Sequence, residues 1–464
     1  MARLEPEASL SPKVKVAENS YRAPVVLKWP APRGVGSAAR DAVEAGPWIG
    51  FILANTVAAP IVVGHLFLLS STATAGLVQR TVVIACLVSA LQAWRGHRLT
   101  AVEGPAGLWL SVMAALAQVS LGDPHRLLAT LAEFRLGLMC TGVVLAALSF
   151  FGAVSYLQRL FTERVMAVYL ILLSVQLASV FVPQAVVADG RLNGVTLARS
   201  GLVILVTVLL ATRGSRRLRS LSLLSGLLVG WLLAVAFGAS RLGPVPAPLP
   251  AGIALPTWGL SFNLGVVVTC IFAGLVNTSN TVATVRAVSQ ATATASPPVE
   301  ATPRLFDRTN LVTAVGNTFA GLAGSLGLIS LSSSAGVVRL TRSSRRVPFL
   351  AACLITAAVA AAPPTAGVLA SIPASVAAAS LLVTTVPLMV LGLENLRPRA
   401  RPDLEHVRVA VPLLLGLAIF SVPVGTFQGT PGILRLLLGN GLVVGVIVAI
   451  ALDRAPTARS LHPS

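Results

Sequence analysis

The stretch that decides the fold runs from residue 258 to residue 342, where two apolar segments are interrupted by small and polar residues. The first segment carries Val276-Asn277-Thr278-Ser279-Asn280-Thr281, and the second carries Ser330-Leu331-Ser332-Ser333-Ser334-Ala335-Gly336. Polar groups in apolar segments of membrane length are costly unless they face a cavity, another helix or a ligand. Breaks rich in Gly and Ser also free backbone groups that must find partners. This combination is typical of a binding site inside a membrane transporter.

The composition of the whole chain places this stretch in a membrane protein. The 464 residues are 55% hydrophobic and 11% charged, and the mean hydropathy is +0.83. Soluble domains carry about 25% charged residues. Apolar segments of about 17–25 residues, each long enough to cross a bilayer, recur along nearly the whole length. We therefore expect an all-α, multi-pass membrane protein.

The hydropathy pattern predicts fourteen membrane spans. They cover residues 49–69, 76–94, 104–119, 136–154, 165–186, 197–212, 220–238, 258–285, 309–324, 326–341, 347–364, 372–392, 407–422 and 431–452. With this number of crossings and a cytoplasmic N-terminus, most of the 35 Lys and Arg residues fall in inner loops. That bias is the one expected of membrane proteins, and it places both termini in the cytoplasm.

The net charge of +19 does not indicate nucleic-acid binding. Basic residues gather in short loops between apolar spans, as in the run from Arg213 to Arg219, and orientation signals have this distribution. A nucleic-acid partner would need a soluble basic surface. The four cysteines all lie in apolar spans with no zinc or disulfide spacing, so we interpret them as packing residues.

Fourteen spans divide into seven plus seven. Because seven crossings end on the opposite side of the membrane, the second half has the reverse orientation to the first, which makes an inverted repeat. The third span of each half is irregular: one begins Glu103-Gly104-Pro105-Ala106-Gly107, and the other contains the serine run 330–334. Short interrupted segments at matching positions of two halves indicate the substrate site. A half-helix that starts in mid-membrane points free N–H groups at that site. We expect the half-helices of spans 3 and 10 to meet at mid-membrane.

Several motifs resemble a known family. Thr309-Asn310-Leu311 through Gly324 is similar to the family's ninth span, Gly336-Val337-Val338-Arg339-Leu340-Thr341-Arg342 to its "GV..LTR" signature, and Ile372-Pro373-Ala374-Ser375-Val376 to its "IP..V" motif. Ala377-Ala378 replaces the expected Gly-Gly. In order and spacing these motifs resemble the nucleobase–cation symporters, the family of xanthine and uracil permeases that is also called the nucleobase–ascorbate transporters.

The resemblance implies two domains that move against each other in alternating access, usually with proton coupling and often as a homodimer. The core would comprise spans 1–4 (residues 47–154) and 8–11 (256–366), and the gate would comprise spans 5–7 (155–240) and 12–14 (367–453). Residues 1–46 are polar and rich in proline, without the apolar core of a signal peptide, so we expect a disordered cytoplasmic tail. Residues 454–464 would form a second cytoplasmic tail.

The chain departs from the family at its substrate positions. The resemblance puts Asn277 where proton-coupled relatives have a glutamate, and Thr281 where Asp or His is frequent. Ser333 stands at a Glu or Gln position with Ser334 beside it, and Gly107 stands where an aromatic residue is common. Both carboxylates expected at the site are absent, so the coupling ion, H+ or Na+, stays open.

The residue types allow two interpretations at most of these positions. Asn277 and Asn280 share one helix face, where they could bind a ligand edge or join helices. Ser333 and Ser334 could contact the ligand or cap a half-helix, as Ala106 and Gly107 begin the other half-helix. Glu103 could hold a proton as a buried acid, or pair with a loop arginine at the inner mouth, which is the interpretation we favour from the sequence.

We infer three functional hypotheses from these patterns. The first is a secondary transporter for a purine or pyrimidine base such as xanthine or uracil. The second is an anion carrier of the same plan as the sulfate permeases, and the third is a transport-dead membrane scaffold. We expect no enzymatic activity, metal or cofactor, because no phosphate loop, nucleophile elbow or catalytic carboxylate pair is present. Arg greatly outnumbers Lys, which hints at a GC-rich genome and favours a bacterial inner membrane.

Overall fold

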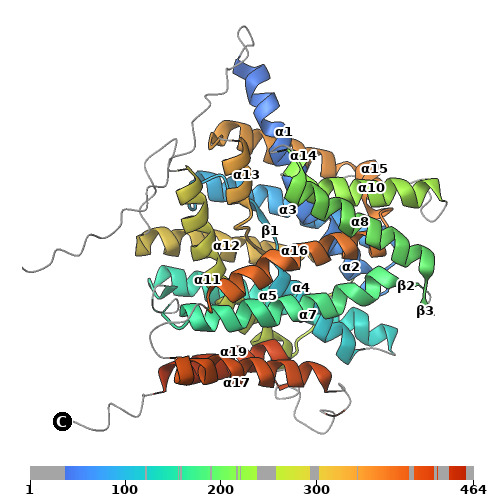
Figure 1. Cartoon of the computed structure of the whole chain (residues 1–464). Coiled ribbons are helices and arrows are strands. Elements are labelled where there is room, and N and C mark those ends of the chain that lie inside the picture. Colours follow the sequence, from blue (N-terminus) through green and yellow to red (C-terminus); the bar gives the residue numbers. More distant parts are fainter. Residues whose placement is uncertain are drawn as a thin grey trace, which may run out of the picture. The chain divides into compact units, whose positions relative to one another are not determined.

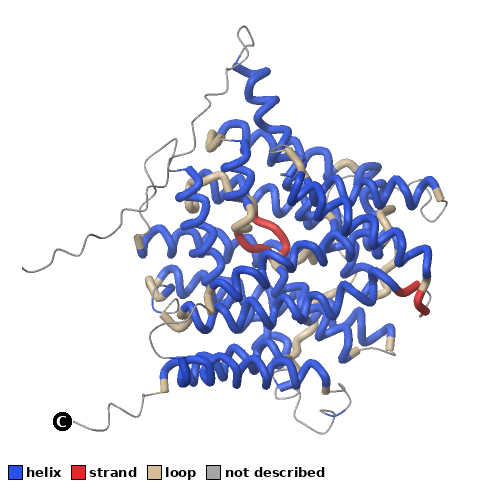
Figure 2. The backbone as a smooth tube through the Cα atoms, viewed as in Figure 1, coloured by secondary structure: helices blue, strands red, loops and turns tan. Residues whose placement is uncertain are grey.

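The computed structural model is helical along most of its described length (Figures 1 and 2). It describes residues 37–120, 123–154, 156, 159–188, 191–215, 218–219, 221–237, 256, 258–292, 302–341, 343–396, 402–422, 426 and 438–455. Residues from Asp41 onward belong to one unit, and the chain before Asp41 belongs to another. The tail expected over residues 1–46 is corrected at its end, because residues 37–46 are helical; residues 1–36 lie outside the described part.

The described helices follow one another in chain order, with connections of very different length. They are α1 (Ser37–Thr56), α2 (Ala58–Leu66), α3 (Ser71–Trp94), α4 (Gly107–Val119), α5 (Pro124–Phe150), α7 (Glu163–Val186), α8 (Gly194–Arg213), α10 (Ser222–Ala236), α11 (Leu264–Thr292), α12 (Pro303–Ala323), α13 (Ser334–Thr341), α14 (Arg346–Ala361), α15 (Pro363–Ala370), α16 (Ala374–Glu394), α17 (Pro402–Ser421) and α19 (Gly441–Arg454). Among the described residues, seven helices are long and apolar enough to cross a membrane, or eight if the bent pair α14–α15 is one span.

Local sequence sets many helix ends. The Ser70 hydroxyl accepts a hydrogen bond from the Ala73 N–H at the start of α3, and Asp123 accepts bonds from the first turn of α5, whose first residue is proline. Such residues are favoured N-caps because they satisfy N–H groups that have no partner inside the helix. Gly324 closes α12 in the left-handed conformation, with φ of 64°, which glycine adopts without strain.

Every predicted span overlaps a helix, but several boundaries differ. The first span is broken at Val57 into α1 and α2, and the fourth begins at Pro124 rather than 136 because of the Asp123 cap. The eighth span ends later than predicted, at Thr292. The first part of the fourteenth span lies outside the described residues, and its helix α19 begins at Gly441. Hydropathy marks the apolar centre of a helix, whereas polar caps decide its ends.

Two of the predicted spans each contain a strand followed by a short helix. Strand β1 (Glu103–Pro105) precedes α4, and strand β4 (Leu328–Ser330) precedes α13. The strands pair antiparallel, with Glu103 opposite Ser330 and Pro105 opposite Leu328. Further bonds from Leu331 N to Val102 O and from Ala106 N to Gly327 O continue the ladder at both ends. Figure 2 shows this strand pair among the helices. A second short pair, β2 (Val187–Ala188) with β3 (Arg191–Leu192), forms the turn between α7 and α8.

The strand pair is held by matching residues from its two flanking helices. The Ser89 hydroxyl of α3 accepts a bond from the N–H of Glu103, the first residue of β1, at 2.8 Å. The Asn317 amide of α12 accepts a bond from the N–H of Leu328, the first residue of β4, at 2.8 Å, and donates to the Leu328 carbonyl at 3.3 Å. An edge strand buried in an apolar protein needs such partners, because unpaired backbone groups there are costly.

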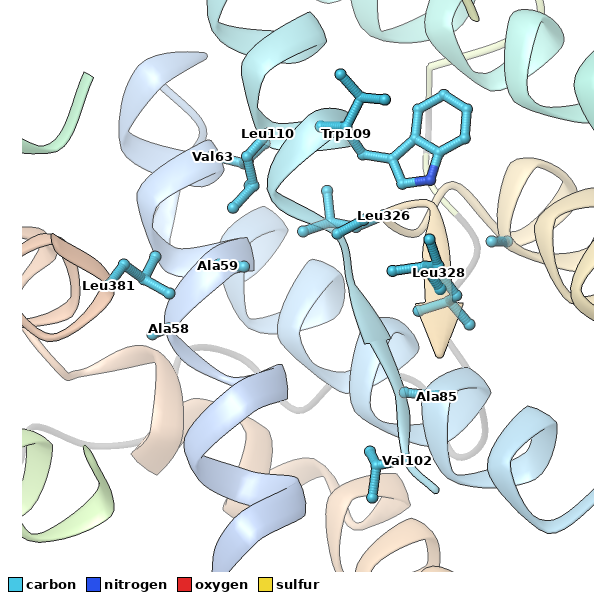
Figure 3. Close-up of a cluster of buried hydrophobic side chains, with 14 of the residues drawn as sticks. Ala58, Ala59, Val63, Ala85, Val102, Trp109, Leu110, Leu326, Leu328 and Leu381 are labelled. Atoms are coloured by element: carbon cyan, nitrogen blue, oxygen red, sulfur yellow. The ribbon is translucent and has the colours of Figure 1, made fainter. Parts of the chain in front are cut away.

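The helices pack in two groups. One group contains α3, α5, α11, α12 and α14, and the other contains α7, α8, α10, α16, α17 and α19. Two helices join the groups: α2 contacts α3 of the first and α16 of the second, and α4 contacts α5 and α11 of the first and α7 of the second. Figure 3 shows Leu381 of α16 beside Ala58 and Ala59 of α2, among fully buried apolar side chains. On the strand side of the same cluster, Trp109 of α4 meets Phe134 edge to face at 6.0 Å.

Candidate functional site

The two half-helices leave the strand pair in opposite directions, because the strands that precede them are antiparallel. The N-terminus of α4 has Ala106 as its N-cap, which offers no side-chain cap. The first N–H groups of α13 are already engaged: Ser334, Ala335 and Gly336 donate to the carbonyls of residues 331–333. The sequence predicts two equivalent amide ends, whereas in the structure the α4 end is the more available for a ligand.

The serine run serves mainly to hold the strands together. The Ser334 hydroxyl is buried and accepts a bond from the Val102 N–H at 3.0 Å, just before β1. Ser333 is exposed. Ser334 therefore joins the two half-spans, a structural role that the sequence does not suggest; a ligand contact by Ser333 or Ser334 stays a prediction.

One face of α11 points toward the strand pair. Thr284 donates its hydroxyl to the Ser330 carbonyl of β4 at 2.9 Å. Thr281 and Asn277 lie three and seven residues earlier, about one and two helical turns along the same face. Both are buried, with exposed fractions of 3% for Thr281 and 5% for Asn277. Among the described residues, nothing bonds to Asn277 Nδ2 or to Thr281 Oγ1. Buried polar atoms without partners are rare and indicate a missing ligand, ion or water.

Three other predicted residues lie at the margin of this face. Asn280 is half-buried, one helical turn from Asn277. Gly107 begins α4, and a Cβ atom there would lie 2.7 Å from Leu177 Cδ1 of α7. Ala106 is buried and its N–H is used by the strand ladder. Gly107 therefore permits the close approach of α4 to α7 rather than an aromatic contact with a ligand.

Glu103 lies inside the strand pair rather than at the inner mouth. Its side chain is fully buried, and the Ser330 hydroxyl donates to its Oε1 atom. No arginine of the described chain forms an ion pair with it. The interpretation of Glu103 as one half of a loop ion pair was wrong, because β1 carries it into the protein.

Sequence reasoning missed the polar residues that hold the site. Ser89, Thr284 and Asn317 each bond a strand backbone, at sequence separations of 14, 46 and 11 residues. It also missed a bond between the helix groups, in which Ser111 of α4 donates to Gln176 Oε1 of α7 at 2.6 Å. Polarity inside apolar spans was the available signal, but it does not reveal the partner.

A family model described as "Permease family", that of the xanthine and uracil permeases, matches residues 47–425. The chain belongs to this family. The protein is therefore a multi-pass membrane transporter, and the family predicted from the motifs is confirmed. The match covers every element that builds the site, from α2 to α16.

Two relatives of this permease support the same family assignment. The protein named "Putative purine permease YwdJ" of Bacillus subtilis is 27% identical over 426 residues, which are 88% of this chain and 94% of that protein. "Putative purine permease CPE0397" of Clostridium perfringens is 23% identical over 410 residues, covering 86% of each chain.

Solved structures resemble this permease in fold. The transmembrane domain of the cyanobacterial bicarbonate transporter BicA matches 91% of this chain and 98% of its own, with a TM-score of 0.58 and 15% identity. SLC26A9 matches 89% of this chain and 65% of its own, with a TM-score of 0.61 and 13% identity. At these identities the likeness shows the fold alone.

Proposed function

We propose that this permease is a secondary active transporter for a purine or pyrimidine nucleobase such as xanthine or uracil. The observation that carries the proposal is the α11 face, where Asn277 and Thr281 present polar atoms without protein partners beside the strand pair. The edge of a nucleobase alternates donors and acceptors, and a carboxamide can both donate and accept. The names of the two relatives, both purine permeases, favour the same substrate class.

The mechanism that we propose is alternating access of a core against a gate. The core comprises residues 47–154 and 256–366, the gate comprises 155–240 and 367–453, and fourteen crossings form a seven-plus-seven inverted repeat. The two packing groups support this division. The matching anchors Ser89 and Asn317 support the repeat, because each holds the first residue of the strand in its own half.

The same proposal includes the setting of the transporter. A homodimer in the bacterial inner membrane with both termini in the cytoplasm fits the family resemblance and the distribution of basic residues. Coupling to H+ or Na+ would provide the driving force.

Uptake of radiolabelled bases tests the substrate. A strain that lacks its own base transporters would express the protein, and uracil, xanthine, guanine and hypoxanthine would be offered separately. We expect accumulation of at least one base, reduced by competition from its unlabelled form. No accumulation of any of the four, with the protein present in the membrane, would contradict the proposal.

An anion is the second candidate substrate. The fold likeness to BicA and SLC26A9 favours it, as does the absence of an acidic side chain among Asn277, Thr281 and Thr284 on the site face of α11. The uncapped N-terminus of α4 would attract a negative charge. Flux of bicarbonate, chloride or sulfate in proteoliposomes, without any binding of a base, would select this alternative. A protein that no small molecule stabilises against heat would instead be a scaffold.

A further inference from the structure

Glu103 is a buried acid in the backbone that connects the two half-helices. Its side chain has no exposed surface, and its N–H is bonded to Ser89. Oε1 accepts a bond from the Ser330 hydroxyl, directly opposite in the strand pair. Oε2 is buried and has no hydrogen-bond partner in the described part of the chain. One carboxyl oxygen is therefore held, and the other is available.

The elements around Glu103 supply no compensating charge. Strand β4 and helix α4 contain no charged residue, and α3 contains one, Arg80. Arg80 lies about 13 Å along α3 from Ser89, and it donates to the Gly324 carbonyl. The remaining titratable side chains of the adjoining loop and of α11, α12 and α13 are Arg95, His97, Arg98, Cys270, Arg286, Arg304, Asp307, Arg308 and Arg339. None of them forms a described hydrogen bond or ion pair with Glu103.

His97, the other buried titratable group near β1, does not supply a positive charge at neutral pH. Burial, with Arg346 and Arg308 nearby, lowers the pKa of His97 to about 3. Its Nδ1 accepts a bond from the Leu99 N–H at 3.0 Å, which also requires the unprotonated nitrogen. The His97 imidazole is therefore neutral at neutral pH.

A buried carboxylate without a cation costs several kcal/mol, so a cation must accompany Glu103 while it is enclosed. A metal ion would need several oxygen ligands arranged around it, and the hydroxyls that bond Glu103 are already fixed by other hydrogen bonds. The Ser89 hydroxyl already donates to Ala85 O at 2.6 Å and accepts from Glu103 N, and the Ser330 hydroxyl is engaged with Oε1. A proton needs one oxygen, and Oε2 provides it.

We propose that Glu103 is the proton-binding site that couples substrate movement to the proton gradient, an inference that rests on the proposed nucleobase transport. The carboxylate takes one proton on Oε2 from the outer side. It stays a neutral acid while the transporter changes from outward-facing to inward-facing, and it then releases the proton inside. One proton and one positive charge then move with each neutral base. Ser330 links the two sites, because its hydroxyl bonds Glu103 and its carbonyl accepts from Thr284 on the substrate face of α11.

The variant Glu103→Gln separates binding from coupling. The glutamine oxygen keeps the bond from Ser330 and removes the titrating group, so labelled base should still bind and exchange across proteoliposomes. A pH gradient of one unit supports about tenfold accumulation with one proton per base. We expect this accumulation with the wild-type protein. With Glu103→Gln, the concentration of base inside the vesicles should only become equal to the concentration outside. Glu133→Gln is the matched control, because it makes the same chemical change at a residue that bonds Asn263 away from the strand pair.

Several outcomes would overturn the inference while leaving nucleobase transport intact. In the first, a pH gradient drives the same accumulation of base through Glu103→Gln as through the wild-type protein. In the second, a sodium gradient alone drives accumulation through the wild-type protein. A second measurement covers a variant that fails to fold. A pH-sensitive dye trapped in wild-type vesicles should report lumenal acidification on addition of the transported base, and base uptake without acidification would equally overturn the proposal. If the wild-type protein neither binds nor exchanges any base, the proposed function itself fails.

Discussion

At the scale of single residues, the site depends on which polar atoms the fold leaves without partners. Ser334 and Thr284 have their hydroxyls bonded to backbone groups, whereas Asn277 and Thr281 keep free polar atoms. Asparagine at residue 277 removes the negative charge that a carboxylate would place there, yet keeps an oxygen and gains a donor. In the transport that we propose, ligand recognition at this face works through neutral hydrogen bonds, and the group that takes up a proton is Glu103.

Replacing Asn277 with Ala should weaken ligand binding far more than folding. The variant loses one or two hydrogen bonds to the ligand, worth about 1–2 kcal/mol, which is roughly a tenfold loss of affinity. No described bond from Nδ2 to the protein is lost, so the melting temperature should stay close to that of the wild type. Binding of labelled base to purified protein checks the affinity, and Asn395→Ala, at the C-terminal end of α16, is the control. An unchanged affinity would remove Asn277 from the site.

Acid should destabilise the protein partly through His97. The pKa of this imidazole is near 6.5 in an unfolded chain and about 3 in the folded protein. Between these values the unfolded chain binds more protons, so stability falls as pH falls through this window, by up to about 1.4 kcal/mol per pH unit. His97→Asn, which can still accept the Leu99 N–H, should flatten the fall in melting temperature from pH 6.5 to pH 4. The exposed His65→Asn should leave the slope unchanged; an equal slope in both variants would contradict the prediction.

At the scale of elements, the strand pair is the joint between the two halves of the chain. Three helices bond its backbone through Ser89, Thr284 and Asn317. A two-stranded pair is marginal on its own, so these side chains provide much of its support. The bond from Ser111 to Gln176 also ties α4 to α7, and a transporter that moves core against gate must exchange it for other partners during the cycle.

Asn317→Leu should damage the strand pair strongly. Leucine has a similar size but leaves both the N–H and the carbonyl of Leu328 without partners in a buried position. Each such group costs about 1–3 kcal/mol, so we expect a destabilisation of about 2–5 kcal/mol. Thr318→Val is the matched control, since the Thr318 hydroxyl bonds Ala314 within its own helix. Thermal unfolding in detergent gives the comparison, and equal melting temperatures would show that Asn317 does not support β4.

At the scale of the whole molecule, relatives named as purine permeases and a bicarbonate transporter both resemble this protein. The bicarbonate transporter BicA and SLC26A9 share this architecture at low identity. Because one fold hosts many functions, the arrangement of helices does not by itself name the substrate. The α11 face and Glu103 are where such differences would act.

Fourteen crossings predict the side on which each loop lies. In a background without the four cysteines, single cysteines would replace the exposed Arg191, between α7 and α8, and the exposed Arg454, at the end of α19. Arg191→Cys should react with a membrane-impermeant thiol reagent in intact cells, because five crossings precede it. Arg454→Cys should react after the membrane is opened. Labelling of both from the same side would contradict fourteen crossings with cytoplasmic termini.

The sequence by itself determined the membrane class, the approximate position of the apolar helices, the two strand-interrupted segments and the family. These follow from local quantities: apolar length, the cost of unpaired backbone groups in lipid, and the residues that begin or end a helix. The tertiary structure decided which polar groups have hydrogen-bond partners. Glu103 meets Ser330 across 227 residues, and Ser334 meets Val102 across 232. Whether a polar atom is bonded or free depends on partners brought together by folding, so only the tertiary structure distinguishes Asn277 and Thr281, which keep polar atoms without described partners, from Thr284, which is bonded.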